Sequence, residues 1–162
     1  LDLMQGGPLA IDEISIDQFD AIVYGEREPR RWMAGSSFFR RTQDADPGFE
    51  EKTTGELIQM AISYEDDGGE AHVRIYRNGD KIGDYTQGPL VTWEAGDTEA
   101  LFGIRAYIGT TPYGWIDAVV EEARIYNVVL SQNEINGLQV GGEPVDSRGK
   151  LATLWGTIKR SR

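Results

Sequence analysis

Short runs in which apolar and polar residues alternate dominate the first 130 residues. In one run, four apolar side chains lie on one face of the chain: Ile58, Met60, Ile62 and Tyr64. Gln59, Ala61 and Ser63 lie on the other face, and this period of two predicts a half-buried β-strand. The Asp-Asp-Gly-Gly sequence at residues 66–69 predicts a turn, after which Val73 and Ile75 line the core face of a second strand.

Asn78 and Gly79 predict a tight hairpin, because this dipeptide tolerates the two positive φ angles of a type I′ turn. A returning strand is expected over residues 80–85, and a further alternating run predicts one strand over residues 101–108. Helical periodicity is nearly absent before Ser131. Short strands separated by turns indicate an antiparallel sandwich or barrel rather than a parallel sheet with crossover helices.

A strand followed by a short helix is predicted near residue 130. Ala123 and Ile125 alternate with polar residues over 121–126, so we expect a strand there. Ser131 and Glu134 have the spacing of a capping box, which predicts that a helix begins after Ser131.

The sequence Glu-Glu-Ala-Arg-Ile-Tyr-Asn at residues 121–127, followed by Leu-Ser-Gln-Asn-Glu-Ile at 130–135, resembles the C-terminal part of laminin G-type, concanavalin A-like jelly-roll domains. Tyr-Arg-Asn-Gly at 76–79 also matches that family, and residues 19–27, 31–36 and 40–42 look like the versions in large bacterial surface or periplasmic proteins. The resemblance implies an all-β concanavalin A-like β-sandwich (jelly roll) with a short helix after the last strand. It also implies a secreted, bacterial, extracytoplasmic protein. The family's usual first strand has no counterpart here, and an uncovered sheet edge invites pairing with another chain.

Length and composition indicate one domain and a tail. The chain has 162 residues, of which 40% are hydrophobic, enough for one core. We assign residues 1–142 to the sandwich, lacking its first strand, and residues 143–162 to a linker and a basic amphipathic tail. No apolar run is long enough for a transmembrane segment, and the absence of cysteine excludes disulfides and thiolate metal sites.

The formal net charge of −11 argues against nucleic acid as a partner, because phosphate binding requires a basic surface. The charge is uneven, since residues 143–162 carry five bases against two acids. The tail and the body of the chain should therefore attract each other weakly.

No catalytic residue is predicted. Laminarinase-type enzymes on this fold need two carboxylates about 5–5.5 Å apart on one strand, and the chain has no matching pattern. Glu13 and Asp17 would lie on one strand face, but four residues apart they would be roughly 13 Å from each other. His72 is the only histidine and is expected on the solvent side of its strand.

A cluster of arginines and aromatic residues lies between residues 24 and 42. Five of them form a candidate ligand-binding site for an anionic sugar or an acidic protein surface: Tyr24, Arg27, Arg30, Arg31 and Trp32. In the alternative interpretation Trp32, Phe38 and Phe39 belong to the core, and the arginines pair with nearby acids such as Glu26 and Glu28.

The tail provides a candidate partner-binding surface. Leu151, Leu154, Trp155 and Ile158 have the spacing of one helix face, so residues 149–160 could form an amphipathic helix that docks on the sandwich or on a partner. An extended strand is the alternative, and it would divide these side chains between two faces.

A structural calcium ion is the one cofactor that the sequence suggests. The family resemblance places Glu121 where relatives often have an aspartate that binds calcium, although a hydrogen-bonded structural carboxylate is the alternative. Asp66, Asp67 and Glu70 are interpreted as turn residues. Two functions remain open, namely a noncatalytic interaction module that binds other domains or subunits of an extracytoplasmic assembly, and a carbohydrate-binding module that binds glycan.

Overall fold

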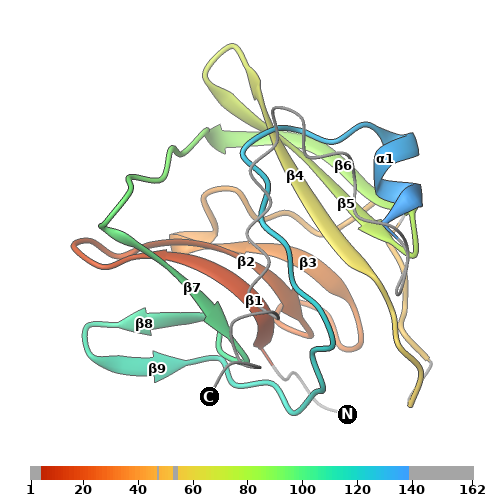
Figure 1. Ribbon diagram of the computed structural model, residues 1–162, viewed down its shortest axis with the longest axis horizontal. Coiled ribbons are helices and arrows are strands. Elements are labelled where there is room, and N and C mark those ends of the chain that lie inside the picture. The colour runs from red at the N-terminus through yellow and green to blue at the C-terminus, as the bar shows by residue number, and fades with distance from the viewer. Residues whose placement is uncertain (1–4, 47, 53–54, 139–162) are drawn as a thin grey trace, which may run out of the picture.

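The computed structural model describes residues 5–46, 48–52 and 55–138. Within this part, two main antiparallel sheets and one small hairpin sheet form the structure (Figure 1). The first sheet has the order β3-β2-β1-β7, and the second has the order β4-β5-β6. Helix is confined to a 3-10 turn and the short α1, as the alternating sequence predicts.

The first sheet consists of β1 (Gly6–Glu13), β2 (Gln18–Tyr24), β3 (Trp32–Ser36) and β7 (Thr98–Phe102). Ala10 of β1 lies between Ala21 and Leu101 of its two neighbours, and all three are buried. These small and apolar side chains face the hairpin of β8 (Ala106–Ile108) and β9 (Thr111–Tyr113), where Ala106 completes the cluster. One face of the first sheet is therefore covered by the small hairpin.

The second sheet consists of β4 (Met60–Asp67), β5 (Glu70–Arg77) and β6 (Asp80–Pro89). Val73 and Ile75 of β5 are fully buried, as predicted. The Asn78-Gly79 hairpin is confirmed, with φ of 48° at Asn78 and 82° at Gly79. Gly68 and Gly69 form the predicted turn between β4 and β5.

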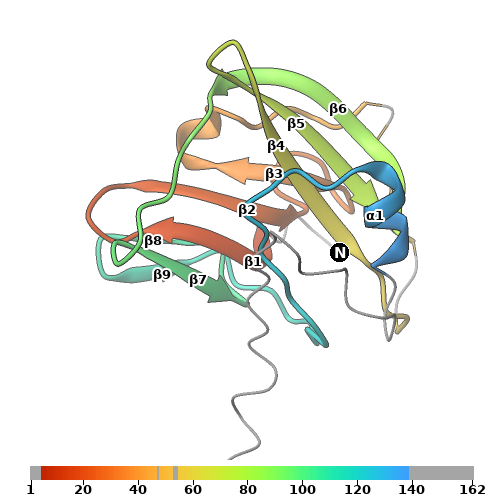
Figure 2. The same ribbon diagram turned by 45° about the horizontal axis from the view of Figure 1, so that its top comes forward.

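The two main sheets pack face to face around a second apolar cluster (Figure 2). Trp32 and Ala34 of β3 contact the side of the second sheet that carries Val73 and Ile75. Met33, between them in sequence, belongs to the cluster under the small hairpin. β3 is thus buried on both faces, which is why all five of its residues are buried. The antiparallel β-sandwich predicted from the sequence is confirmed.

The strand predicted over residues 101–108 is wrong as a single element. β7 ends at Phe102 and β8 begins at Ala106. Gly103 between them has φ of 77°, a left-handed conformation that ends the pleat. Leu101 and Ile104 are both buried. In a continuous strand, residues three positions apart would face opposite sides, so the chain must turn over between them.

The strand predicted over residues 121–126 is also wrong. Alternation is present, but the described residues form no strand between β9 and α1. A strand requires a backbone neighbour as well as a pattern of side chains. The chain instead crosses from β9 past β1 and the edge of β4 to reach α1 (Figures 1 and 2).

The helix after this segment is confirmed as α1 (Gln132–Gly137). Its capping box is complete, since the Ser131 side chain accepts from the Glu134 backbone and the Glu134 side chain accepts from Ser131 N at 2.8 Å. Ile135 is buried against Tyr76 and Leu130, so α1 covers the part of the outer face of the second sheet around Tyr76.

The prediction that Glu13 and Asp17 share a strand face is wrong. β1 ends at Glu13, and Asp17 lies in the turn that leads to β2. Glu13 accepts a hydrogen bond from Gln18 across this turn at 2.8 Å.

Candidate functional site: an apolar groove between the sheets

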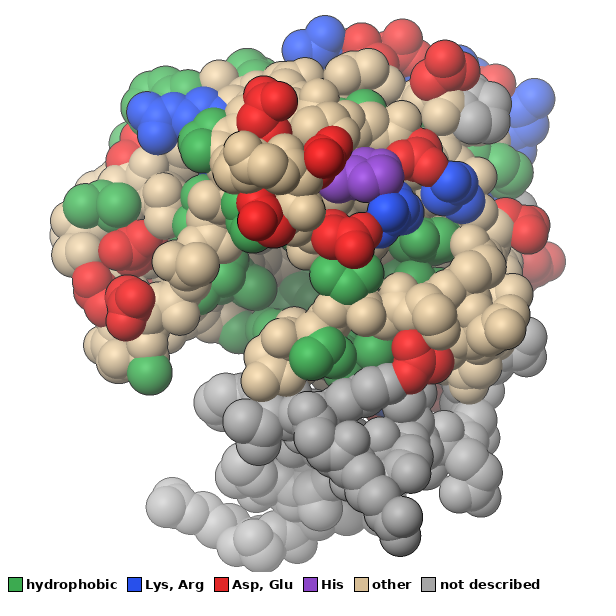
Figure 3. All heavy atoms as spheres, turned by 90° about the horizontal axis from the view of Figure 1, so that it is seen from above, with side chains coloured by type: hydrophobic (Ala, Val, Ile, Leu, Met, Phe, Trp, Pro, Cys, Tyr) green, Lys and Arg blue, Asp and Glu red, His purple; other side chains and the backbone are tan. Residues whose placement is uncertain are grey.

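A groove of about 1030 Å³ lies between the two main sheets, beside the segment that leads to α1. We refer to it as the inter-sheet groove. Its walls come from β1, β2, β4, the residues after β6 and residues 116–130. Viewed from above, hydrophobic side chains lie in a recess of the surface (Figure 3).

The side chains of β4 show why the groove exists. Met60, Ile62 and Tyr64 face the same side as Val73 and Ile75, yet they remain half-buried while those of β5 are fully buried. β4 is the edge strand of its sheet, and none of the described strands lies beyond it. The groove is therefore a part of the inter-sheet core that the described residues leave unfilled.

The segment along the groove has a backbone without strand or helix partners. Ile116 N donates to Gly103 O at 3.1 Å, and the next backbone-to-backbone hydrogen bond in the described part of the chain is Ile135 N to Ser131 O. Several apolar side chains of this region face solvent, with Val119 86% and Trp115 65% exposed. Backbone that has no partner among the described residues of an apolar segment is a surface to which another chain segment can pair.

Two of the predicted ligand residues meet at the groove. The ring centroids of Tyr24 and Trp32 are 4.8 Å apart, and both residues line the groove. Trp32 Nε1 donates to Glu51 Oε2 at 3.4 Å, and Glu51 is held by Arg77 at 2.7 and 3.0 Å. The aromatic pair is thus fixed in place, with Trp32 itself buried.

The predicted arginines do not point at this aromatic pair. Arg27 makes a two-pronged contact with Asp44 at 2.7 and 3.1 Å. Arg31 pairs with Glu28 at 2.5 Å, and Arg30 pairs with Glu50. The alternative interpretation of paired arginines agrees with these contacts, although Glu26 pairs with Arg105 instead of an arginine of the cluster.

The loop after β3 carries Phe38 and Phe39, two aromatic residues of the cluster between residues 24 and 42. Phe38 and Phe39 are 70% and 45% exposed, so the interpretation of these two side chains as core is wrong. Both have φ of 55°, which bulky residues rarely adopt. Arg40 lies over the Phe38 ring at 5.3 Å and Arg27 over Phe39 at 5.8 Å. Only the folded backbone reveals this exposed aromatic pair.

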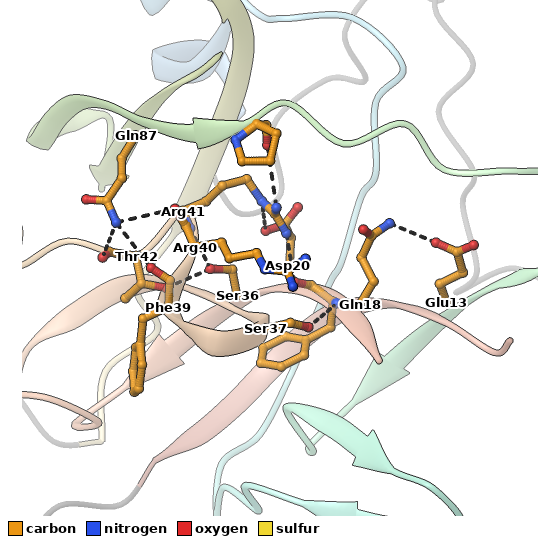
Figure 4. Close-up of polar contacts among 12 residues, drawn as sticks. Glu13, Gln18, Asp20, Ser36, Ser37, Phe39, Arg40, Arg41, Thr42 and Gln87 are labelled. Carbon is orange, nitrogen blue, oxygen red and sulfur yellow. Dashed lines mark hydrogen bonds and ion pairs between the residues drawn. The ribbon is translucent and has the colours of Figure 1, made fainter. Parts of the chain in front are cut away.

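Polar contacts hold the loop in this conformation (Figure 4). Gln87 Nε2 donates to the carbonyl oxygens of Phe39, Arg40 and Thr42 at 3.1, 3.3 and 3.1 Å. Ser36 Oγ accepts from Arg41 N at 2.8 Å. These bonds offset the strain and hold the backbone in the conformation that exposes Phe38 and Phe39.

Asp20 and Tyr64 are the polar side chains at the floor of the groove. Burial raises the pKa of Asp20 to about 6, against the opposing effect of Arg41. Tyr64 Oη is buried and has no hydrogen-bond partner in the described structure. Burial, with the neighbouring Asp20 carboxylate, raises the pKa of Tyr64 well above its usual value. Tyr64 therefore stays neutral.

Calcium binding at Glu121 stays a prediction. Glu121 is exposed on the rim of the groove, and the described ranges contain no group of three or more acidic, histidine or cysteine side chains that could hold a metal ion. Calcium requires several oxygen ligands. Asp66 Oδ1 accepts from Gly69 N at 2.8 Å, which agrees with its interpretation as a turn residue.

The outer face of the second sheet is charged. His72 lies there among acidic and basic side chains (Figure 3), with its Nε2 2.5 Å from Asp84 Oδ1 and its Nδ1 3.0 Å from Arg74 Nη2. This placement agrees with the predicted solvent-side histidine.

The candidate partner-binding residues of the tail lie outside the described residues: Leu151, Leu154, Trp155 and Ile158. Among the helices that the structure describes, none is sufficiently long and apolar to span a membrane.

Two facing antiparallel sheets with an apolar groove between them define an antiparallel β-sandwich domain. A family model described as the concanavalin A-like lectin/glucanases superfamily, of laminin G type, matches residues 21–136. The chain belongs to this family, as its resemblance to laminin G-type domains indicated. No curated protein matches the chain, and no solved structure matches it.

Proposed function

We propose that this chain is a noncatalytic interaction module of an extracytoplasmic multidomain protein and that the inter-sheet groove is its binding surface. The groove itself is the observation that carries this proposal. Its volume of about 1030 Å³ lies at the upper end of the range of ligand pockets, roughly 300–1,000 Å³, and leaves room for peptide side chains. Its apolar walls, and the backbone along its side that finds no partner within residues 5–46, 48–52 and 55–138, suit a peptide segment of another domain or subunit.

The placement of the acids supports a role without catalysis. Asp12 and Asp20 both have a pKa raised to about 6, as catalytic acids often do. Asp20 lies opposite Ile11 in the pairing of β1 with β2, and both residues line the groove. Asp12, the next residue after Ile11, instead interacts with the backbone of Tyr107 in β8. The two carboxyl groups therefore lie on opposite faces of the first sheet and cannot act on one bond.

A carbohydrate-binding function is the second candidate, favoured by one observation. Tyr24 and Trp32 form a fixed aromatic pair at the groove, and Glu51 lies beside them. Flat aromatic surfaces with nearby hydrogen-bonding groups suit a sugar ring. The arginines predicted to hold an anionic sugar pair with acids of the same chain, so a neutral glycan is the better ligand for this alternative.

Binding measurements on the full chain separate these functions. We expect a panel of amphipathic peptides to bind, and the Ile62→Glu variant to bind at least about tenfold more weakly, because a charge would enter the apolar groove. Ile14→Glu is the matched control, since Ile14 is 62% exposed in the β1–β2 turn. Peptide binding that Ile62→Glu leaves unchanged would refute the groove as the binding surface.

A parallel assay addresses the second candidate and catalysis. The carbohydrate-binding function would be favoured over the interaction module by two results together. Soluble β-glucan oligosaccharides would bind to the chain but not to its Trp32→Ala variant, and no peptide would bind. Release of reducing sugar from the same β-glucans would overturn the noncatalytic assignment. We expect none.

A further inference from the structure

The inter-sheet groove has an exposed acidic rim. Glu56, Asp117, Glu121 and Glu122 line it and are exposed. Arg124 is the one basic residue among the described lining residues, and it is held by Glu122 with its Nε 2.6 Å from Glu122 Oε1. An apolar trough with an acidic edge is complementary to a segment that is apolar on one side and basic on the other.

The chain itself contains one such segment. Residues 149–160 carry the stripe of Leu151, Leu154, Trp155 and Ile158, flanked by Lys150, Lys159 and Arg160. We call it the basic tail segment. Within residues 143–162, five bases stand against two acids, whereas the rest of the chain is strongly acidic.

The connection between the two is short enough. Leu138, the last described residue, itself lines the groove. Residues 139–150 can span up to about 40 Å when extended, and a domain of this length has a radius of gyration of only about 15 Å. Every part of the groove is thus within reach of the basic tail segment. Tethering at this distance gives an effective concentration on the order of millimolar, so a weak contact suffices for occupancy.

We propose that the basic tail segment binds in the inter-sheet groove of its own chain, with Leu151, Leu154, Trp155 and Ile158 facing the apolar walls and the bases facing the acidic rim. The inference rests on the proposed function, because it uses the same groove. It adds regulation: an external peptide must displace the basic tail segment, which acts as a competitor attached to the domain.

Photo-crosslinking tests the location directly. A photoreactive benzoylphenylalanine at Trp155 of the full chain should form adducts within the chain, mapped by mass spectrometry to residues 57–64, 90–93 or 116–126. The same group at Thr157, which lies off the apolar stripe, is the matched control and should give far fewer adducts there. Adducts that map only outside the groove, or only between two chains, would overturn the proposal.

Competition provides a second readout. Trp155→Glu should strengthen binding of an added amphipathic peptide by about tenfold, since release of a tethered competitor raises the fraction of open grooves. Thr157→Glu introduces the same charge off the stripe and should strengthen peptide binding much less, because it removes no apolar contact. Suppose that the parent chain and both tail variants bind the peptide with equal affinity and that Ile62→Glu still weakens this binding. The basic tail segment would then not be the occupant of the groove, but the proposed interaction module would remain supported. Absence of peptide binding in every variant would refute the proposed function itself.

Discussion

Arg41 Nε donates to Asp20 Oδ1 over 2.8 Å, and the two side chains are only 2% and 7% exposed. The same guanidinium donates through Nη2 to Phe19 O at 3.3 Å. This contact ties the loop after β3 to β2, at the floor of the inter-sheet groove. It thereby couples the exposed aromatic loop to the candidate binding surface through one buried ion pair.

Loss of one partner of this pair should destabilise the domain strongly. Asp20→Ala leaves a buried guanidinium without its counter-ion, and we expect the free energy of unfolding to fall by about 3–5 kcal/mol. Urea denaturation measures this. Asp44→Ala is the matched control, because the exposed pair of Asp44 with Arg27 should contribute less than about 1 kcal/mol. Equal losses in the two variants would show that burial of the Asp20 pair has no energetic consequence.

Asp12 should make stability depend on pH. Burial, opposed by a hydrogen bond to the Tyr107 backbone and reinforced by the charges of Glu99 and Asp17, raises its pKa from 3.8 to about 6. A folded-state pKa above the unfolded one means that the native state binds more protons, so this contribution is fully present below about pH 4 and is lost as pH rises through 6.

Asp12→Asn should remove this contribution. Near pH 7 the variant should be more stable than the parent chain by on the order of 1–3 kcal/mol, and its stability should fall less between pH 4 and 7. Thermal unfolding at a series of pH values measures both effects, with Asp46→Asn, an exposed acid that does not contribute to the pKa of Asp12, as the control for loss of charge. The same pH dependence in Asp12→Asn and the parent chain would contradict the prediction. Asp20, whose pKa is also raised to about 6, accounts for the dependence that remains.

The left-handed backbone at Phe38 should be costly. At φ of 55° a bulky side chain is strained by roughly 1–2 kcal/mol, whereas asparagine tolerates this conformation. We expect Phe38→Asn to raise the midpoint of thermal unfolding, since Phe38 is 70% exposed and contributes little burial. Phe102→Asn, at an exposed position of β7, controls for loss of an exposed aromatic side chain. A lower midpoint for Phe38→Asn would show that the Arg40 contact outweighs the strain.

Calcium should leave the domain unchanged. A ligand that binds only the native state raises its stability by mass action, and the described residues contain no group of three acidic, histidine or cysteine side chains that would hold the ion at Glu121. We expect the same midpoint of thermal unfolding with excess calcium or with chelator. A calcium-dependent rise that disappears in Glu121→Gln would instead establish Glu121 as a ligand.

Local features of the fold could be predicted because their causes are local. The Asn78-Gly79 turn depends on the φ angles that two residues tolerate, and the capping box depends on Ser131 and Glu134 three positions apart. The alternation around Val73 and Ile75 likewise identified their buried face. Each of these needs information from only a few consecutive residues.

The predictions from the sequence were wrong where contacts with distant parts of the chain determine the local structure. Residues 121–126 alternate as a strand would, but the described structure provides no backbone neighbour for them. Phe38 and Phe39 are of a residue type that is usually buried. The path of the chain after β3 nevertheless exposes both side chains. A sequence pattern shows which side chains favour burial, whereas the available neighbours determine which of them are buried.

The sequence by itself determined the antiparallel class, the hairpin, the capped helix and the family of this protein. The tertiary structure alone decided the inter-sheet groove, the pairing of the arginines with Asp44, Glu50 and Glu28, and the separation of Asp12 from Asp20. Turns and caps are governed by interactions within a few residues. A groove depends on how two sheets from distant parts of the chain face each other, and no short stretch of sequence encodes that relation.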